Sequence, residues 1–187
     1  MQTQAFMTGK LVFLRKLREE DLNENYLGWI NDPEVLKYRE NKSYPSSMAQ
    51  LRAFYDALQL KTDVHLAICT KKDNKHVGNL SLDCLQWSHH RAALNIMVGD
   101  KSVWGKGVGT EAIALLTRHA FMNMGLHHVW AESPNPGFNA VVKKLGWTQE
   151  GIKRESFFCD GSYIDMECHS ILRPEWDKLS PKQRAEA

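Results

Sequence analysis

The sequence lacks any apolar run that approaches the roughly 18 to 20 residues of a membrane-spanning helix. Residues 1–10 also lack the apolar core of a signal peptide. These two absences predict a cytoplasmic protein that has no membrane partner.

An excess of charge of one sign is missing as well. The 187 residues include 24 Lys and Arg against 22 Asp and Glu, and the two signs are interspersed along the chain. A surface that binds nucleic acid needs clustered basic residues, so nucleic acid is not an expected partner.

Cysteines are few, and none shows the paired spacing of a zinc site or lies beside histidines suited to a metal. All four fall within apolar, strand-like stretches, so we expect buried free thiols and no metal. They are Cys69, Cys84, Cys159 and Cys168.

One domain is expected over residues 11–176, between an N-terminal extension (1–10) and a polar, frayed tail (177–187). Alternating apolar residues predict strands, and the short links between consecutive strands favour antiparallel pairing. Asp160-Gly161 predicts a tight turn between the last two strands. The expected strands cover residues 11–17, 64–70, 77–85, 92–98, 128–131, 148–158 and 162–172.

Apolar residues at helical spacing predict helices before and after the central strands. Asn31-Asp32-Pro33 ends a first helix and opens a short second one, and Ser46 or Ser47 caps a third. The expected helices cover residues 22–30, 34–39, 48–58, 108–124 and 138–145.

A glycine-rich segment, Trp-Gly-Lys-Gly-Val-Gly-Thr at residues 104–110, lies between an expected strand and an expected long helix. A helix N-terminus leaves backbone N–H groups unpaired, and glycines let an anion approach them closely. The spacing fits neither the P-loop nor the dinucleotide fingerprint. A plain tight turn is the alternative, but the order of strand, loop and helix favours a diphosphate site.

The wider sequence around this loop resembles a known family. Trp-Gly-Lys-Gly-Val-Gly-Thr-Glu-Ala at 104–112 resembles the acetyl-CoA-binding motif of the GNAT superfamily of N-acetyltransferases, in the branch that contains ribosomal-protein N-acetyltransferases. Asn135 followed by Lys-Leu-Gly-Trp at 144–147 resembles its second signature. Segments 18–22 and 29–35 resemble its first strand and helix pair, so the resemblance spans nearly the whole chain.

The resemblance implies an α/β fold with a mixed, mostly antiparallel sheet of about seven strands, splayed in the middle and flanked by helices on both faces. It also implies that acetyl-CoA is the acyl donor. Backbone groups of Ile96, Met97 and Val98 would pair with the pantetheine as an added strand would, and Asn135 would bond the same arm. The remaining residues of the implied cofactor site are Trp104, Gly105, Lys106, Gly107, Val108, Gly109 and Thr110.

Two groups that often move protons in this family are missing here. The position of the usual tyrosine acid, counted from Asn135, is Val142. The strand before the loop, which often carries a Glu near its start, begins Ala92-Ala93-Leu94 instead. The residues that carry the proton chemistry must therefore be sought elsewhere.

Glu132 is the candidate general base, because it ends the strand that would face the cleft. Strand alternation places it on one side with His128 and Trp130. An exposed carboxylate at a strand end, with no catalytic role, is the alternative. Asp83 and His90 are weaker candidates, and a base acting through water or an amine of low pKa that needs no base also remains open.

The acceptor side would be bordered by residues 29–38 and 157–163, with Asn31 and Tyr38 as contacts. Residues 24–35 are similar to GNAT proteins that acetylate amino groups of nucleotide-linked sugars, which makes an amino sugar the first expected acceptor. A protein N-terminal amine is the second and a small amine or aminoglycoside the third. A non-catalytic acyl-CoA-binding module is the alternative from another class, and a monomer or homodimer is expected.

Overall fold

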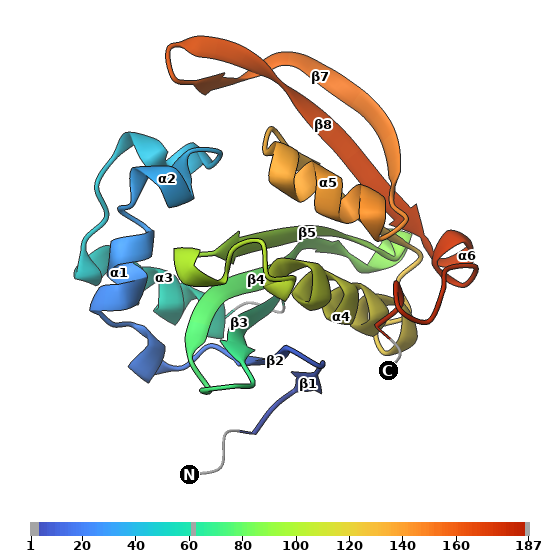
Figure 1. Cartoon of the computed structure of the whole chain (residues 1–187), viewed down its shortest axis with the longest axis horizontal. Coiled ribbons are helices and arrows are strands. Elements are labelled where there is room, and N and C mark those ends of the chain that lie inside the picture. The colour runs from blue at the N-terminus through green and yellow to red at the C-terminus, as the bar shows by residue number, and fades with distance from the viewer. Residues whose placement is uncertain (1–3, 61–62, 186–187) are drawn as a thin grey trace.

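The computed structural model describes residues 4–60 and 63–185. They form one eight-stranded sheet in the order β1-β2-β3-β4-β5-β6-β8-β7, with helices on both faces (Figure 1). The strands are β1 (Met7–Thr8), β2 (Val12–Lys16), β3 (Val64–Thr70), β4 (His76–Gln86), β5 (Arg91–Val98), β6 (His128–Ser133), β7 (Thr148–Cys159) and β8 (Ser162–Leu172). The α-helices are α1 (Glu24–Trp29), α2 (Pro33–Leu36), α3 (Met48–Gln59), α4 (Val108–Met122), α5 (Pro136–Lys144) and α6 (Arg173–Trp176).

Neighbouring strands pair antiparallel throughout the sheet except at β5 and β6, which are parallel. The mixed, mostly antiparallel sheet is therefore confirmed. The strand beyond the expected seven is β1, in which Met7 pairs with Leu14 and Thr8 with Phe13. It was missed because a two-residue strand is too short to show a period in the sequence.

Alternation along β2 supplies both cores of the protein. Val12 and Leu14 are fully buried in the cluster that contains the apolar face of α4, and Phe13 is buried in a second cluster with residues of α1 and α3. Successive side chains of a strand point to opposite faces, so one apolar run serves two layers. The helices α4 and α5 accordingly cover one face, and α1 and α3 cover the other.

The helix caps follow the sequence closely. Ser47, not Ser46, caps α3, and its hydroxyl and the side chain of Gln50 form a reciprocal capping box. Of the expected apolar stripe on this helix, Leu51 is buried, whereas Phe54 is 46% exposed. Phe54 lines a pocket that is described below.

The turn between β7 and β8 is formed as expected. Asp160 and Gly161 both have positive φ, at 50° and 81°, which is the left-handed backbone that this two-residue turn requires. The hairpin is long and projects from the body of the molecule above α5 (Figure 1).

The expectation of a frayed tail is wrong for residues 177–185. The side chain of Gln183 donates a hydrogen bond to the carbonyl of Lys144, 3.1 Å away, at the end of α5. Arg184 places its guanidinium over the ring of Trp176, and Leu179 packs close to Gly146. The tail was misjudged because its polar residues bind the C-terminal end of a helix that is distant in sequence.

Two of the four cysteines differ from the expected buried state. Cys69 and Cys159 are buried, Cys168 is partly exposed and Cys84 is exposed. Cys84 has φ of 51° and lies where the register between β4 and β5 shifts, so its side chain leaves the regular alternation.

Across residues 4–60 and 63–185, no helix combines the length and the apolar character needed to cross a membrane.

Candidate functional site

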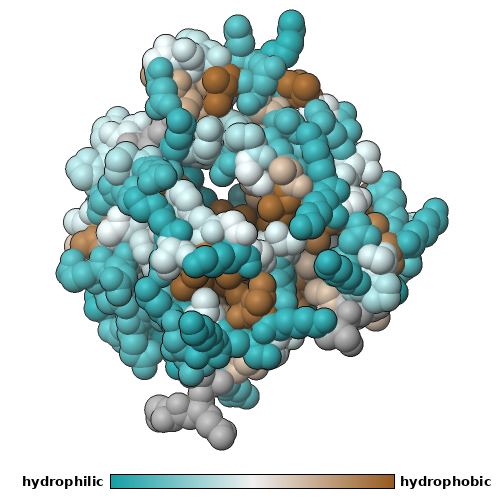
Figure 2. All heavy atoms as spheres, in the orientation of Figure 1, coloured by the Kyte–Doolittle hydropathy of each residue, from teal (hydrophilic) through white to brown (hydrophobic). Residues whose placement is uncertain are grey.

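The parallel strands β5 and β6 are paired over only a short distance. The paired residues are Arg91 with His128, Ala92 with Val129, and Ala93 with Trp130. Beyond these pairs β5 continues to Val98 and β6 to Ser133 without pairing to each other. Figure 2 shows a hollow in this region, between the side of the molecule that carries α2 and the side that carries α5. The sheet is therefore splayed in its middle, as expected.

The splay leaves one edge of β5 open. Gly99 donates a backbone hydrogen bond to Val77 across the β4–β5 ladder, at 2.9 Å. Because antiparallel bonding alternates, Ile96 and Val98 turn their N–H and C=O groups away from β4, toward the splay. Met97 turns its backbone groups toward β4 instead. Of the three residues expected to pair with the pantetheine, only Ile96 and Val98 therefore direct backbone groups toward the splay.

Side chains already contact this open edge. Nε1 of Trp104 donates a hydrogen bond to the carbonyl of Val98 at 2.8 Å. Nη1 of Arg39 donates one to the carbonyl of Ile96 at 3.1 Å. Trp104 thereby fastens the glycine loop to the strand before it, and Arg39 connects the chain after α2 to the same strand.

The glycine loop has the backbone that its sequence predicts. Gly105 and Gly107 have φ of 71° and 83°, and Gly107 is the N-cap of α4 with no side chain to pair the first N–H groups. A Cβ on Gly109 would come within 3.6 Å of the Val98 side chain. The first N–H groups of α4 therefore have no side-chain cap, although the Leu11 side chain would lie 3.4 Å from a Cβ on Gly107. A helix N-terminus of this kind can bind an anion.

Ion pairs anchor the segment that leads into the loop. Asp100 pairs with Lys75 at 2.6 Å, and Lys101 pairs with Asp32 at 2.7 Å and with Glu34 at 2.9 Å. Lys101 thereby ties the loop to the first turn of α2. The roles expected for Lys106, Val108 and Thr110 stay predictions.

Asn135 caps α5 on the other side of the splay. Its Oδ1 accepts hydrogen bonds from the N–H groups of Gly137 and Phe138, at 2.9 and 3.4 Å. The amide nitrogen of this side chain has no partner among the residues that the structure describes, so it is available to donate. Its contact with the pantetheine stays a prediction.

Glu132 and Val142 differ in what their surroundings permit. Glu132 lies at the end of β6 and forms an ion pair with Lys153 on β7, with its side chain 29% exposed. Its role as the base stays a prediction. Val142 is fully buried in the core beneath α5.

A pocket of about 200 Å3 lies on the face of the sheet that α1 and α3 cover. Its floor comes from β3, β4 and β5, and it reaches the open part of β5 at Ile96. Both a carboxylate, Asp83, and a guanidinium, Arg39, line it. The full lining is Leu17, Tyr26, Arg39, Phe54, Leu58, His65, Leu66, Asn79, Leu80, Ser81, Asp83, Asn95, Ile96 and Met97.

Asp83 is held from three sides in this pocket. Nε2 of His65 lies 3.1 Å from its Oδ1, while the Ser81 hydroxyl and the Asn95 amide donate to its Oδ2 at 2.7 and 2.8 Å. Burial raises the pKa of the Asp83 carboxyl, but these three contacts outweigh it, so the pKa lies below its usual value. Asp83 is therefore an anion with a fixed orientation.

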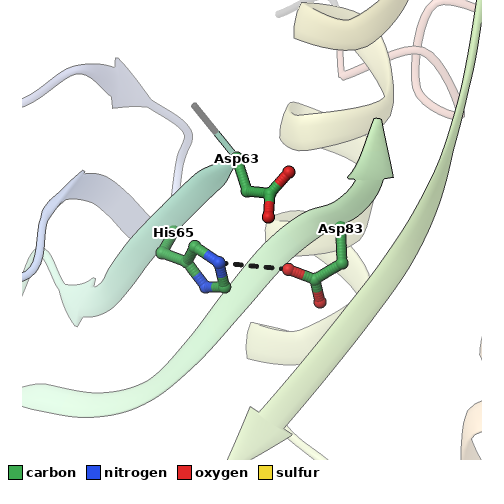
Figure 3. Close-up of side chains that lie close together, drawn as sticks. All are labelled: Asp63, His65 and Asp83. Atoms are coloured by element: carbon green, nitrogen blue, oxygen red, sulfur yellow. Dashed lines mark ion pairs between the residues drawn. The ribbon is translucent and has the colours of Figure 1, made fainter. Parts of the chain in front are cut away.

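Asp63, the residue just before β3, completes this group (Figure 3). One atom each from Asp63, His65 and Asp83 lie within 4.8 Å of one another, close enough for all three to face a single cationic group. Figure 3 also shows that one ring nitrogen of His65 faces Asp83 while the other points away.

Two further residues set the polarity of the pocket. Burial raises the pKa of Tyr26 to about 12, so its phenol stays a neutral hydrogen-bond donor. Burial lowers the pKa of Arg39, whose guanidinium forms no ion pair within the described part of the chain. A partly buried guanidinium that forms no ion pair among the described residues marks a place for a polar or anionic group.

The expected acceptor contacts have other partners. The amide of Asn31 donates to the carbonyls of Leu27 and Ser46 and accepts from the N–H of Ser46, so it joins α1 to the chain before α3. Tyr38 does not line the pocket, whereas its neighbour Arg39 does. The contacts of Asn31 and Tyr38 with an acceptor stay predictions.

The two segments expected to border the acceptor side do meet. Lys37, just after α2, pairs with Asp160 at the tip of the β7–β8 hairpin at 2.8 Å. The thiol of Cys159 lies 3.7 Å from the carbonyl of Lys37. These contacts bring the hairpin tip to the end of α2 on the far side of the hollow from α5.

Sequence reasoning missed His65 and Arg39. His65 occupies a regular strand position and Arg39 follows a helix, where histidine and arginine are unremarkable. Their only signal was alternation, since His65, Asp83 and Asn95 fall on the polar side of β3, β4 and β5. That signal requires the register between the strands, which the sequence does not contain.

Comparison with known proteins agrees with this geometry. Residues 12–148 match the acetyltransferase (GNAT) domain. The chain belongs to the GNAT acetyltransferase family. It is accordingly an acyl-CoA-dependent N-acyltransferase, and the resemblance noted in its sequence is confirmed.

Several GNAT relatives span nearly the same length. YjcK of Bacillus subtilis, described as a probable N-acetyltransferase, is 26% identical over 179 residues, which cover 90% of this chain and 98% of YjcK. Spermidine N(1)-acetyltransferase of Escherichia coli is 26% identical over 155 residues, or 81% of each chain. The structure of a Vibrio cholerae spermidine N-acetyltransferase, solved with CoA and spermine, matches with a TM-score of 0.80 at 21% identity, over 90% of this chain and 99% of that one.

Proposed function

We propose that this protein transfers the acetyl group of acetyl-CoA to the primary amine of a small polar acceptor, with a nucleotide-linked amino sugar as the acceptor. The observation that carries the proposal is the open edge of β5 between a bare helix N-terminus and a polar pocket. The N-terminus of α4 is suited to a pyrophosphate, and the pocket is suited to an amine.

The residues present fit acetyl-CoA. The N–H and C=O groups of Ile96 and Val98 face the splay, Asn135 has a free donor, and Gly107 leaves the first N–H groups of α4 uncovered. In this arrangement the loop holds the diphosphate, and β5 aligns the pantetheine so that its end reaches the pocket at Ile96. Acetyl-CoA supplies the acyl group as a thioester.

The residues of the pocket would bind the amine and stabilise the negative charge that develops on the acyl oxygen. Asp83 attracts the amine in its cationic form, and the neutral phenol of Tyr26 can donate a hydrogen bond to negative charge that develops on the acyl oxygen. Because the pocket is smaller than the roughly 300 to 1,000 Å3 of drug-sized sites, only the part of the acceptor that bears the amine would be enclosed. The nucleotide of a linked sugar would remain outside.

Arg39 favours an amino sugar over a polyamine. The Escherichia coli relative is named for spermidine, which is cationic along its whole length. A polyamine in this pocket would place positive charge close to the buried guanidinium of Arg39, which forms no ion pair among the described residues. Sugar hydroxyls would instead accept hydrogen bonds from it.

A panel of acceptors tests the proposal directly. The release of CoA thiol is measured with acetyl-CoA and a UDP-linked amino sugar, glucosamine, a peptide with a free N-terminus, spermidine or an aminoglycoside. We expect the fastest release with an amino sugar. Faster release with spermidine or the peptide would overturn the acceptor assignment, and no release with any amine would overturn the proposed function.

The cofactor site is tested by Gly107→Glu, which places a carboxylate where the pyrophosphate would bind. A matched control is Gly125→Glu after the other end of α4, because Gly125 also has positive φ, at 67°, and open space around it. We expect calorimetry to show loss of acetyl-CoA binding in the first variant only. Equal affinity in both folded variants would show that the loop does not hold the pyrophosphate.

A further inference from the structure

The pocket holds a histidine and a carboxylate side by side. Nε2 of His65 lies 3.1 Å from Oδ1 of Asp83, an electrostatic contact that does not have the alignment of a hydrogen bond. Nδ1 of the imidazole points away from Asp83 (Figure 3). The nearby carboxylate favours the tautomer with its proton on Nε2, which leaves Nδ1 able to accept a proton.

The orientation of Asp83 is itself fixed by its neighbours. The Ser81 hydroxyl and the Asn95 amide both donate to Oδ2, at 2.7 and 2.8 Å, and leave Oδ1 to face His65. A carboxylate anchored in this way restricts the imidazole ring, and orientation of a base by a third group is a recurring feature of catalytic sites. The hydrogen bonds from Ser81 and Asn95 therefore hold the Asp83 carboxylate in one orientation.

The position of this pair in the sheet places it beside the reaction. Asp83 is opposite Ala93 on β5, and Ala93 is the last residue of β5 that pairs with β6. Asn95, which bonds to Asp83, is followed by Ile96, whose backbone faces the splay. His65, Asp83 and Ile96 all line the same pocket. His65 is separated from β5 by β4, so an acceptor that extends across the pocket from β3 to β5 would meet both the imidazole and the end of the acyl donor.

We propose that His65, positioned by Asp83, accepts the proton of the acceptor amine during acetyl transfer. This inference rests on the proposed function. The acceptor, attracted as an ammonium, first releases one proton to water. As the neutral amine nitrogen then bonds to the acyl carbon, its next proton moves to Nδ1 of His65. The carbon–sulfur bond breaks, the electron pair leaves on the CoA sulfur, and the sulfur takes the proton, so that amine and thioester become amide and thiol.

The charges around His65 suit this role. Two carboxylates lie close to it, Asp83 from β4 and Asp63 from the residue just before β3. Arg39 lies across the pocket, and α1 contributes the neutral phenol of Tyr26. From α3, the described part of the lining is Phe54 and Leu58, and the ring of Phe54 meets the imidazole edge-on with centroids 6.4 Å apart.

The test compares variants in thiol release with the fastest amine of the acceptor panel. We expect His65→Gln to lower kcat/KM by roughly 100-fold or more, as loss of a general base typically does. Acetyl-CoA affinity, measured by calorimetry, should stay within twofold. The control is His89→Gln in the exposed turn before β5, which should match the unmodified protein.

A second pair of variants separates a chemical role from a structural one. Imidazole added to His65→Ala should restore part of the lost rate, because the small base enters the space that the side chain leaves. Asp83→Asn should also slow the reaction, since it removes the charge that orients His65, while acetyl-CoA still binds. Should His65→Gln fail to bind acetyl-CoA, Asp83→Asn and the imidazole experiment carry the test.

Glu132→Gln decides between the two candidate bases. We expect this variant to keep at least a third of kcat/KM. A loss of 100-fold in Glu132→Gln with near-normal rates in His65→Gln would overturn the inference and support Glu132. An absence of thiol release from the unmodified protein with every amine would overturn the proposed function, and the inference with it.

Discussion

Arg39 donates a hydrogen bond to the backbone carbonyl of Ile96 across 3.1 Å. This bond joins the chain after α2 to the open edge of β5, at the point where the acceptor pocket reaches the splay. The Arg39 side chain thus contacts the strand proposed to bind the acyl donor and also lines the pocket proposed for the acceptor.

Arg39→Gln should weaken acceptor binding. A hydrogen bond to a charged group contributes about 1.5 to 3 kcal/mol, so we expect the acceptor KM to rise about tenfold or more. The measurement is thiol release against acceptor concentration, with Arg52→Gln on the exposed face of α3 as the matched control. An unchanged acceptor KM in Arg39→Gln would show that the guanidinium does not contact the acceptor.

Trp104→Phe should loosen the cofactor loop. The ring stays, but the Nε1 hydrogen bond to the carbonyl of Val98 is lost, which costs about 1 kcal/mol and weakens acetyl-CoA binding about fivefold. Calorimetric titration with acetyl-CoA measures the effect, and Trp87→Phe at an exposed turn is the control. Equal affinities in the two variants would exclude this hydrogen bond as a support of the loop.

Asp21→Asn should destabilise the fold at neutral pH. Asp21 and Arg15 form a buried pair at 2.6 Å, and removing one partner of such a pair costs about 3 to 5 kcal/mol. Chemical unfolding at pH 7 measures this loss. The control is Asp56→Asn on the exposed face of α3, which should stay within about 0.5 kcal/mol of the unmodified protein.

The effect of Asp21→Asn should shrink in acid. Burial raises the pKa of Asp21, but hydrogen bonds from Arg15 and from the N–H of Arg18 lower it more, so its folded pKa lies below the unfolded value. Its stabilisation is therefore complete above about pH 4, the unfolded pKa, and is lost as pH falls through the folded pKa. A gap between variant and unmodified protein that stays constant from pH 7 into acid would contradict this linkage.

Removal of divalent cations should leave activity unchanged. The transfer requires a proton acceptor, hydrogen-bond donors and an anion site, and the chain supplies a candidate for each of them. Thiol release is measured before and after treatment with EDTA and gel filtration. A loss of more than tenfold that Mg2+ or Zn2+ restores would contradict the expectation that no metal is needed.

Much of the fold can be predicted from local sequence patterns. The strands β3 and β8 have the expected bounds, and the Asp160-Gly161 turn and the Ser47 cap follow from residue types that suit one backbone shape. The glycine loop was found for the same reason, since Gly105 and Gly107 adopt positive φ beside a helix. Turns, caps and loops can be predicted from the sequence because the residues that form them are close together in both sequence and space.

The reactive groups of the site were harder to find. Glu132 was chosen because it ends a strand, yet β8 and β7 bring Lys153 against it. Val142, the position expected for the usual tyrosine, is completely buried. The residues proposed in its place, His65 and Asp83, lie on the consecutive strands β3 and β4 and come together only through the register of that pair.

The sequence by itself determined the family, the order of the elements and the backbone of the glycine loop, because each depends on residues within a few positions of one another. Only the tertiary structure decided which side chains share the pocket proposed for the acceptor. His65, Asp83 and Asn95 meet because the register of β3, β4 and β5 aligns them, and Arg39 reaches Ile96 because α2 packs beside the splay. Register and helix packing are set by the burial of both cores, which no single segment encodes.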